Sequence, residues 1–127
     1  MNLLLDTHTF LWFAAGDTRL SARARRAMEA PDAELFLSVV SVWEIAIKSS
    51  LGRLSLPLPL NEYIAEKCNQ GFRILLIDWT HAAAVEKMPF HHRDPFDRLL
   101  AAQAELEAMP LLSADPVFRD YNVKVLW

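Results

Sequence analysis

Glycine, cysteine and long apolar runs are all scarce in this 127-residue chain, and each scarcity excludes a class of protein. Its glycines, Gly16, Gly52 and Gly71, are too far apart for a GxGxxG or GxxxxGK loop, so neither a dinucleotide cofactor nor P-loop chemistry is expected. Cys68 is the single cysteine, which excludes an internal disulfide and a cysteine-based zinc site. The net charge of −3 argues against holding nucleic acid by bulk positive charge, but a bound metal can still meet phosphates.

No uncharged apolar stretch approaches the ~20 residues that a membrane helix needs, so no membrane partner is expected. The apolar stretch 3–5 follows no basic residue and is interrupted by Asp6, which is unlike a secretory signal. Together with the single cysteine, this predicts a cytoplasmic protein. Apolar residues make up 53% of the chain, which is enough for the core of a single domain over 1–127.

Short apolar runs alternate with segments of helical periodicity. The runs are too continuous for half-exposed strands and therefore predict buried strands of a parallel sheet. The predicted strands cover 2–6, 34–38, 72–77, 109–113 and 123–127. The predicted helices cover 9–15, 21–30, 42–51, 61–69, 80–88 and 95–108, with a short turn at 116–121. This alternation predicts a three-layer α/β/α fold, Rossmann-like, with a central, mainly parallel five-stranded sheet.

Residues that favour helix N-caps stand just before most of these helical segments. They are Ser21, Ser41, Thr80, Asp94 and Asp115. A proline follows each of the last two, at the first helical position, where proline is favoured.

Four acidic residues follow predicted strands or begin predicted helices: Asp6, Glu44, Asp97 and Asp115. In an open parallel sheet these positions meet at one edge, where ligands bind. Each also has a structural explanation, because Asp6 and Asp115 can cap helices and Asp97 suits the positive end of a helix dipole. Ser41 with Glu44 matches a capping box. Four carboxylates together would repel one another without a cation, so the group predicts one or two Mg²⁺ or Mn²⁺ ions and phosphodiester hydrolysis.

Four motifs stand in order along the chain: MNLLLDTHTFLW, SVVSVWEIAIK, HHRDPFDRLLAAQA and LLSAD. They resemble PIN-domain proteins, specifically the VapC-type toxins of type II toxin–antitoxin systems, and the similarity runs from Met1 to Trp127. The resemblance implies an α/β/α fold and a metal-dependent endoribonuclease that inhibits translation or growth. Carried over by motif, the family's acidic residues fall on the same four positions, as catalytic and metal-binding residues.

The resemblance also suggests supporting residues. Ser113 stands where the last motif usually has threonine, and its hydroxyl is expected to orient a ligand or a water. Asp94 belongs to the DPFD signature, and it either caps the helix or supports Asp97 or a water on the metal. Lys48 lies one turn beyond Glu44, so it either steadies that carboxylate, meets a substrate phosphate or forms an ordinary surface pair.

Other residues near the motifs have both a functional and a structural interpretation. Arg98 either contacts the scissile RNA backbone or is solvated. The loop residues His91, His92 and Arg93 either contact RNA phosphates or are solvated. VapC-type toxins usually form homodimers, and a VapB-type antitoxin inhibits them by laying its C-terminal segment in an apolar groove. Trp12 and Trp43 are the groove candidates, with core packing as the alternative.

Two other small α/β classes do not fit the sequence. A receiver module needs adjacent acids after its first strand, but Thr7 follows Asp6. A phosphatase with a nucleophilic aspartate needs a second aspartate two residues on, where this chain has His8. The alternative that stays open is a catalytically silent PIN domain that binds RNA or a protein.

Overall fold

Strands and helices alternate along the chain in the computed structural model, which describes residues 1–90 and 94–127. The strands are β1 (Asn2–Leu5), β2 (Glu34–Ser38), β3 (Arg73–Leu75), β4 (Leu111–Leu112) and β5 (Val125–Leu126). The α-helices are α1 (Thr7–Ala15), α2 (Ala22–Glu29), α3 (Val39–Ser50), α4 (Leu60–Asn69), α5 (Trp79–Ala84) and α6 (Pro95–Leu106). Two short 3₁₀ helices are η1 (Val85–Lys87) and η2 (Pro116–Asp120).

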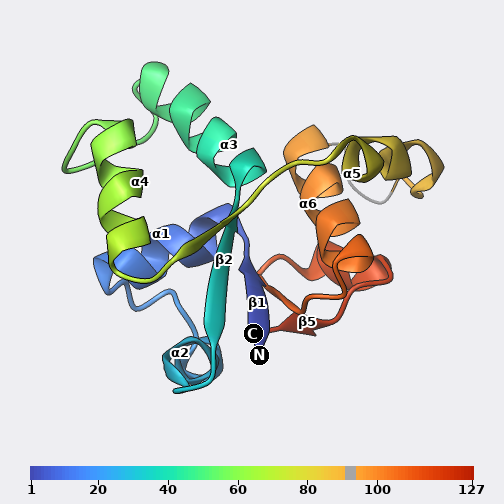
Figure 1. Ribbon diagram of the computed structural model, residues 1–127, viewed down its shortest axis with the longest axis horizontal. Helices are drawn as coiled ribbons and strands as arrows, with labels where there is room; N and C mark the ends of the chain where they lie inside the picture. The colour runs from blue at the N-terminus through green and yellow to red at the C-terminus, as the bar shows by residue number, and fades with distance from the viewer. Residues whose placement is uncertain (91–93) are drawn as a thin grey trace.

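The five strands form one parallel sheet in the order β3-β2-β1-β4-β5. Figure 1 shows α1 and α4 on one side of the central strands and α5 and α6 on the other. This arrangement confirms the predicted three-layer α/β/α fold. In the part of the chain that the structure describes, no helix is both long and apolar enough to cross a membrane.

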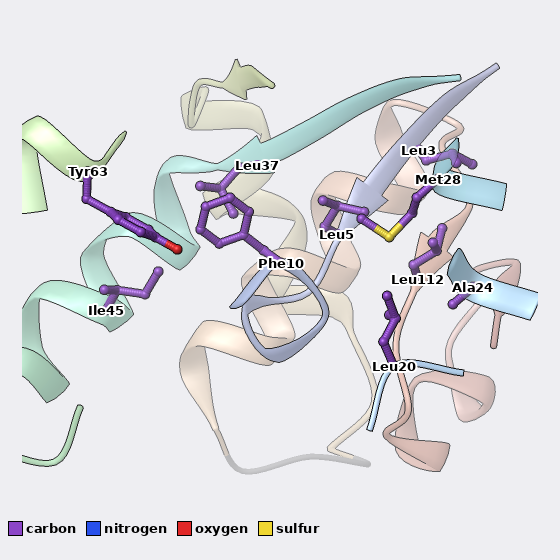
Figure 2. Packing of buried hydrophobic residues seen from close by; sticks show 10 residues of the cluster. All are labelled: Leu3, Leu5, Phe10, Leu20, Ala24, Met28, Leu37, Ile45, Tyr63 and Leu112. Atoms are coloured by element: carbon purple, nitrogen blue, oxygen red, sulfur yellow. The ribbon is translucent and has the colours of Figure 1, made fainter. Parts of the chain in front are cut away.

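The central strand β1 contributes residues to a separate core on each face of the sheet, because successive strand residues point to opposite faces. Leu3 and Leu5 belong to one apolar cluster with residues of α1, α2, α3 and α4, and Leu4 belongs to another with residues of α6 and η2. In the first cluster Phe10 stands edge-on to Tyr63, with 6.1 Å between ring centroids (Figure 2). Burying each large apolar side chain contributes about 1.5–3 kcal/mol, which fixes the sheet between its two helical layers.

The N-caps agree with the sequence prediction at three positions and differ at two. Ser21, Asp94 and Asp115 each accept a backbone N–H, as predicted. The prediction for Ser41 is wrong: β2 leads into α3 without a loop, so the helix begins earlier and the Ser38 hydroxyl accepts the Val40 N–H at 3.0 Å.

The second difference concerns α5. The prediction that Thr80 caps this helix is wrong, because the Asp78 carboxylate accepts the Thr80 N–H at 3.2 Å. His81 completes a capping box, and its Nδ1 accepts the Asp78 N–H at 2.9 Å. Four strands, β1, β3, β4 and β5, are also shorter than predicted. β4 begins only at Leu111, and the preceding Pro110 has no N–H to donate to a ladder.

The carboxyl ends of β1 and β4 mark the place where the strand order reverses. From β1 the chain builds outward through β2 to β3, and then returns to place β4 on the other side of β1. In open α/β sheets, ligands bind beside such a reversal. Asp6 follows β1 and Ser113 follows β4, so two of the predicted site residues lie there.

Candidate active site

Asp6 is held between the ends of β1 and β4. Its carboxylate accepts the Thr9 N–H at 2.7 Å and the Ser113 hydroxyl. The Thr9 hydroxyl in turn donates to the Leu112 carbonyl at 2.9 Å, and the Ser113 Oγ accepts the Asp115 N–H at 3.0 Å. These bonds fix the Asp6 carboxylate in one orientation. Ser113 therefore orients Asp6, and its expected role toward a ligand or a water stays a prediction.

Burial raises the pKa of Asp6 above its ordinary value of 3.8, and hydrogen bonds from Ser113 and Thr9 offset part of that rise. Both hydrogen-bond partners are neutral groups, so they satisfy the carboxylate oxygens without cancelling the charge. A buried carboxylate in such surroundings gains from a bound cation.

Glu44 is buried in α3 and accepts two short hydrogen bonds. The Thr7 hydroxyl donates to its Oε1 at 2.6 Å, and the Lys48 ammonium donates to its Oε2 at 2.6 Å. Lys48 is 38% exposed, so it reaches Glu44 from the solvent side. The capping box proposed for Ser41 and Glu44 is wrong, because both Glu44 oxygens are engaged elsewhere. Among the residues described, the buried Ser41 hydroxyl has no hydrogen-bond partner.

Asp94, Asp97 and Asp115 complete the acidic side. Asp94 accepts the Phe96 N–H at 2.9 Å at the start of α6, and Asp115 accepts the Val117 N–H at 3.0 Å at the start of η2. Asp97 lies in the first turn of α6. Asp94 therefore has the capping role that its place before proline predicts, which leaves its proposed support of Asp97 as a prediction.

One hollow of about 390 Å³ brings these residues together; we call it the acidic pocket. The residues that line it are Asp6, Thr7, His8, Trp12, Glu44, Lys48, Asp94, Asp97, Ala114, Asp115, Pro116 and Phe118. All four predicted acids are present, each from a different segment of the chain. Within residues 1–90 and 94–127, no three acidic or imidazole groups are already arranged to hold a metal. The donor set is nevertheless rich in carboxylate oxygens, which suits hard divalent ions such as Mg²⁺ and Mn²⁺.

An apolar groove of about 470 Å³ adjoins the acidic pocket and shares Thr7, His8, Trp12 and Lys48 with it. Its other lining residues are Leu11, Ala15, Asp17, Arg19, Arg53, Leu54, Ser55, Leu56, Pro57 and Tyr63. Trp12 therefore lies where a groove residue is expected. Trp43 does not line this groove: it stacks edge-on against Phe96, with ring centroids 4.9 Å apart, and is 55% exposed.

Arg98 has neither of the roles considered from its sequence. It is only 5% exposed, so it is not solvated. Its guanidinium donates to the carbonyl oxygens of Pro89 and Val85 at 2.9 and 3.1 Å, and it lies over the Phe90 ring. These contacts hold the guanidinium against the segment before α6 rather than in the acidic pocket. The predicted contacts of His91, His92 and Arg93 with RNA fall outside the described residues.

Sequence reasoning missed Thr7 and Thr9. Thr7 orients Glu44, and Thr9 fixes both Asp6 and the end of β4. A signal was available for Thr9, because it lies three residues after Asp6, the spacing at which an N-cap side chain meets a backbone N–H. Thr7 gave no comparable signal, since its partner lies 37 residues away.

Residues 3–124 match the family model described as PIN domain. The chain belongs to the PIN domain family. This PIN domain is 29% identical over 120 residues to "Ribonuclease VapC22" of Mycobacterium tuberculosis, covering 94% of this chain and 92% of that relative.

Solved structures share the fold of this PIN domain at lower identity. VapBC2 from Rickettsia felis, bound to a DNA fragment from their promoter, has a TM-score of 0.73 at 13% identity and covers 98% of this chain and 97% of that chain. FitAcB from Neisseria gonorrhoeae has a TM-score of 0.67 at 20% identity, and the match covers 97% of this chain and 95% of that chain. The resemblance noted from the motifs is therefore confirmed at the level of family and fold.

Proposed function

We propose that this PIN domain is a metal-dependent endoribonuclease of the VapC type, the toxin of a type II toxin–antitoxin system. The observation that carries the proposal is the convergence of Asp6, Glu44, Asp97 and Asp115 on one pocket at the strand-order reversal. The relative named as a ribonuclease, which aligns with nearly the whole chain, supports the same activity.

Asp6, Glu44, Asp97 and Asp115 would hold one or two Mg²⁺ or Mn²⁺ ions. When bound, such ions supply activation of a water and stabilisation of the leaving oxygen in phosphodiester hydrolysis. The residues of the chain do the positioning. Ser113 and Thr9 orient Asp6, and Thr7 orients Glu44, so two of the proposed ligands are fixed before any metal arrives.

Lys48 and residues 91–93 are the proposed contacts with RNA. The Lys48 ammonium balances the charge of Glu44 in the absence of metal. Because Lys48 is 38% exposed at the rim of the pocket, its ammonium would also be within reach of a substrate phosphate. His91, His92 and Arg93 precede Asp94 in sequence, and we keep them as candidate phosphate contacts.

The apolar groove is the proposed seat of the C-terminal segment of a VapB-type antitoxin. Its shared wall with the acidic pocket means that a bound peptide can lie in the groove and block the acids at once. Several structural neighbours are toxin–antitoxin complexes, which supports such a partner. We further propose a homodimer located in the cytoplasm, as is usual for toxins of this type.

The test is cleavage of a total-RNA preparation by purified, antitoxin-free protein with Mn²⁺, with Mg²⁺ and with chelator. Wild-type protein and Asp120→Ala, which removes an exposed acid outside the acidic pocket, should cut only with metal. Asp6→Ala should lose about 10³-fold or more in rate, because charge stabilisation in the transition state is removed. Folded wild-type protein that cuts nothing would refute the proposal and favour the catalytically silent PIN domain.

A further inference from the structure

Gln103 is a fully buried amide on α6 that the proposed chemistry does not use. It is 0% exposed, although α6 carries exposed residues on its outer side. Its Oε1 accepts the Ser38 hydroxyl, and its Nε2 donates to the Leu76 carbonyl at 3.3 Å. Most buried polar side chains have hydrogen-bond partners, and here both the oxygen and the nitrogen of the amide are engaged.

The Ser38 hydroxyl fixes which way this amide points. Its oxygen already accepts the Val40 N–H at 3.0 Å as the N-cap of α3, and its proton goes to Gln103. Reversing the amide would place an acceptor against the Leu76 carbonyl, which is itself an acceptor. The position therefore requires a donor and an acceptor on one planar group, and a primary amide provides both.

Gln103 reaches the carboxyl ends of two neighbouring strands. Ser38 ends β2 and is paired in register with Leu75 of β3, so Leu76 lies just beyond that strand. The amide thus ties α6 to the sheet edge at which the acidic pocket opens. A helix is stiff over a few turns, so an anchor at Gln103 also fixes Asp97, which lies about 9 Å away along the axis at 1.5 Å per residue.

The other helix held by this contact carries Glu44. Ser38 caps α3, and α3 packs directly against α6. One buried amide therefore joins the start of the helix that bears Glu44 to the helix that bears Asp97. These acids lie 53 positions apart in sequence and share the acidic pocket only through the packing of α3 against α6.

We propose that Gln103 is a positioning residue: it sets the separation of Glu44 from Asp97 and thereby the affinity of the acidic pocket for a divalent cation. The inference rests on the proposed function for its consequence, since it assumes that these acids hold metal. The geometric part, that the amide fixes α3 against α6, does not depend on that assumption.

The experiment compares Gln103→Met with Gln70→Met. Methionine keeps the length of the side chain and removes both hydrogen bonds, and Gln70 is exposed at the end of α4, far along the chain from either acid. Mn²⁺ binding is measured by electron paramagnetic resonance of free Mn²⁺, without RNA, on protein shown to be folded by circular dichroism. The Mn²⁺ dissociation constant of Gln103→Met should rise about 10-fold, within the range for groups that orient metal ligands, while Gln70→Met matches wild type.

A second readout separates failure of the inference from failure of the proposed function. Backbone amide resonances around Glu44 and Asp97 should shift in metal-free Gln103→Met and stay in place in Gln70→Met. Unshifted resonances, or a folded Gln103→Met that binds Mn²⁺ like wild type, overturn the inference. Wild-type protein that binds no Mn²⁺ and cuts no RNA overturns the proposed function instead, and the resonances still decide whether Gln103 positions the two helices.

If Gln103→Met does not fold, Ser38→Ala provides the same test. Alanine removes the hydroxyl that donates to the Gln103 Oε1 and that caps α3, and it leaves the Nε2 donor to the Leu76 carbonyl in place. The same resonances should then shift, and steady-state kinetics should show a reduced kcat with the KM for RNA unchanged. A variant whose only defect is a lower melting temperature would assign Gln103 a purely structural role and overturn the inference.

Discussion

The acidic pocket and the apolar groove share one wall, yet the residues that complete each hollow have opposite character. The pocket is completed by carboxylates from four separate segments, which hydroxyl groups and backbone N–H groups hold in place. The groove is completed by leucine, alanine, proline and tyrosine side chains, with the charged Asp17, Arg19 and Arg53 beside them. Carboxylates crowded without a cation repel one another, whereas an apolar lining left in water gains free energy only when a partner covers it. This difference in character is the reason for proposing a metal ion in the acidic pocket and a protein partner in the apolar groove.

The largest expected effect is the loss of antitoxin affinity when Trp12 is replaced. Trp12 contributes to both hollows and lies 5.8 Å from Trp127, centroid to centroid. Trp12→Ala should raise the Kd for the cognate antitoxin about 30-fold, because a large aromatic anchor typically contributes about 2 kcal/mol. The measurement is isothermal titration calorimetry on protein whose folding has been checked by circular dichroism.

Trp43→Ala is the matched control for that experiment. It removes the same side chain from α3, where it packs against Phe96 outside the groove. Its antitoxin affinity should stay within about 3-fold of wild type, the scatter typical of contacts that are not anchors. Equal losses in the two variants would show that the apolar groove is not the antitoxin site.

The layers and the four acids were predictable because they depend on local patterns. Continuous apolar runs mark buried strands, and strand ends of a parallel sheet meet at one edge whatever the details of packing. That argument brought Asp6, Glu44, Asp97 and Asp115 to one pocket, as the structure shows. Their role as metal ligands stays a prediction.

The remaining features depend on partners that are distant in sequence. Arg98 stands next to Asp97, but its guanidinium bonds are made to carbonyls near residues 85–89, which no local pattern reveals. Trp12 and Trp43 look alike in the sequence, and only the packing of α3 against α6 separates them. The start of α3 was misplaced because Ser38 serves as both the last strand residue and the helix cap.

The second prediction tests the charge balance inside the acidic pocket. Lys48→Met removes the ammonium that lies 2.6 Å from Glu44 and leaves a buried carboxylate without its cation. In chelator, the free energy of unfolding should fall by about 1.5 kcal/mol, less than for a fully buried pair because Lys48 is partly exposed. Saturating Mn²⁺ should restore most of the lost free energy of unfolding.

Chemical denaturation with and without Mn²⁺ measures the effect, and Lys124→Met serves as the control because Lys124 is exposed and outside the acidic pocket. The control should change stability by less than about 0.5 kcal/mol under both conditions, as is usual for surface positions. A deficit in Lys48→Met that Mn²⁺ does not reduce would contradict the view that the ammonium occupies the place of a metal charge.

The third prediction concerns Asp6, where a substitution is expected to raise the stability of the metal-free protein by a small amount. Burial raises its pKa above 3.8, so the folded protein binds this proton more tightly than the unfolded chain does. Without metal, the free energy of unfolding should therefore fall as pH rises from 3.8 through the folded-state pKa, and Asp6 adds no further change above it. At a pH above that pKa the ionised Asp6 thus lowers stability.

Asp6→Asn keeps an acceptor for the Thr9 N–H and a polar contact with Ser113 while removing the charge. In chelator at neutral pH it should raise the melting temperature by about 4 °C, which corresponds to about 1 kcal/mol in a domain of this size. The exposed Asp120→Asn should leave the melting temperature unchanged, and added Mn²⁺ should stabilise wild-type protein more than Asp6→Asn. A metal-free Asp6→Asn that melts below wild type would mean that the ionised carboxylate stabilises the fold by itself. Asp6 would then give no reason to place a cation in the acidic pocket.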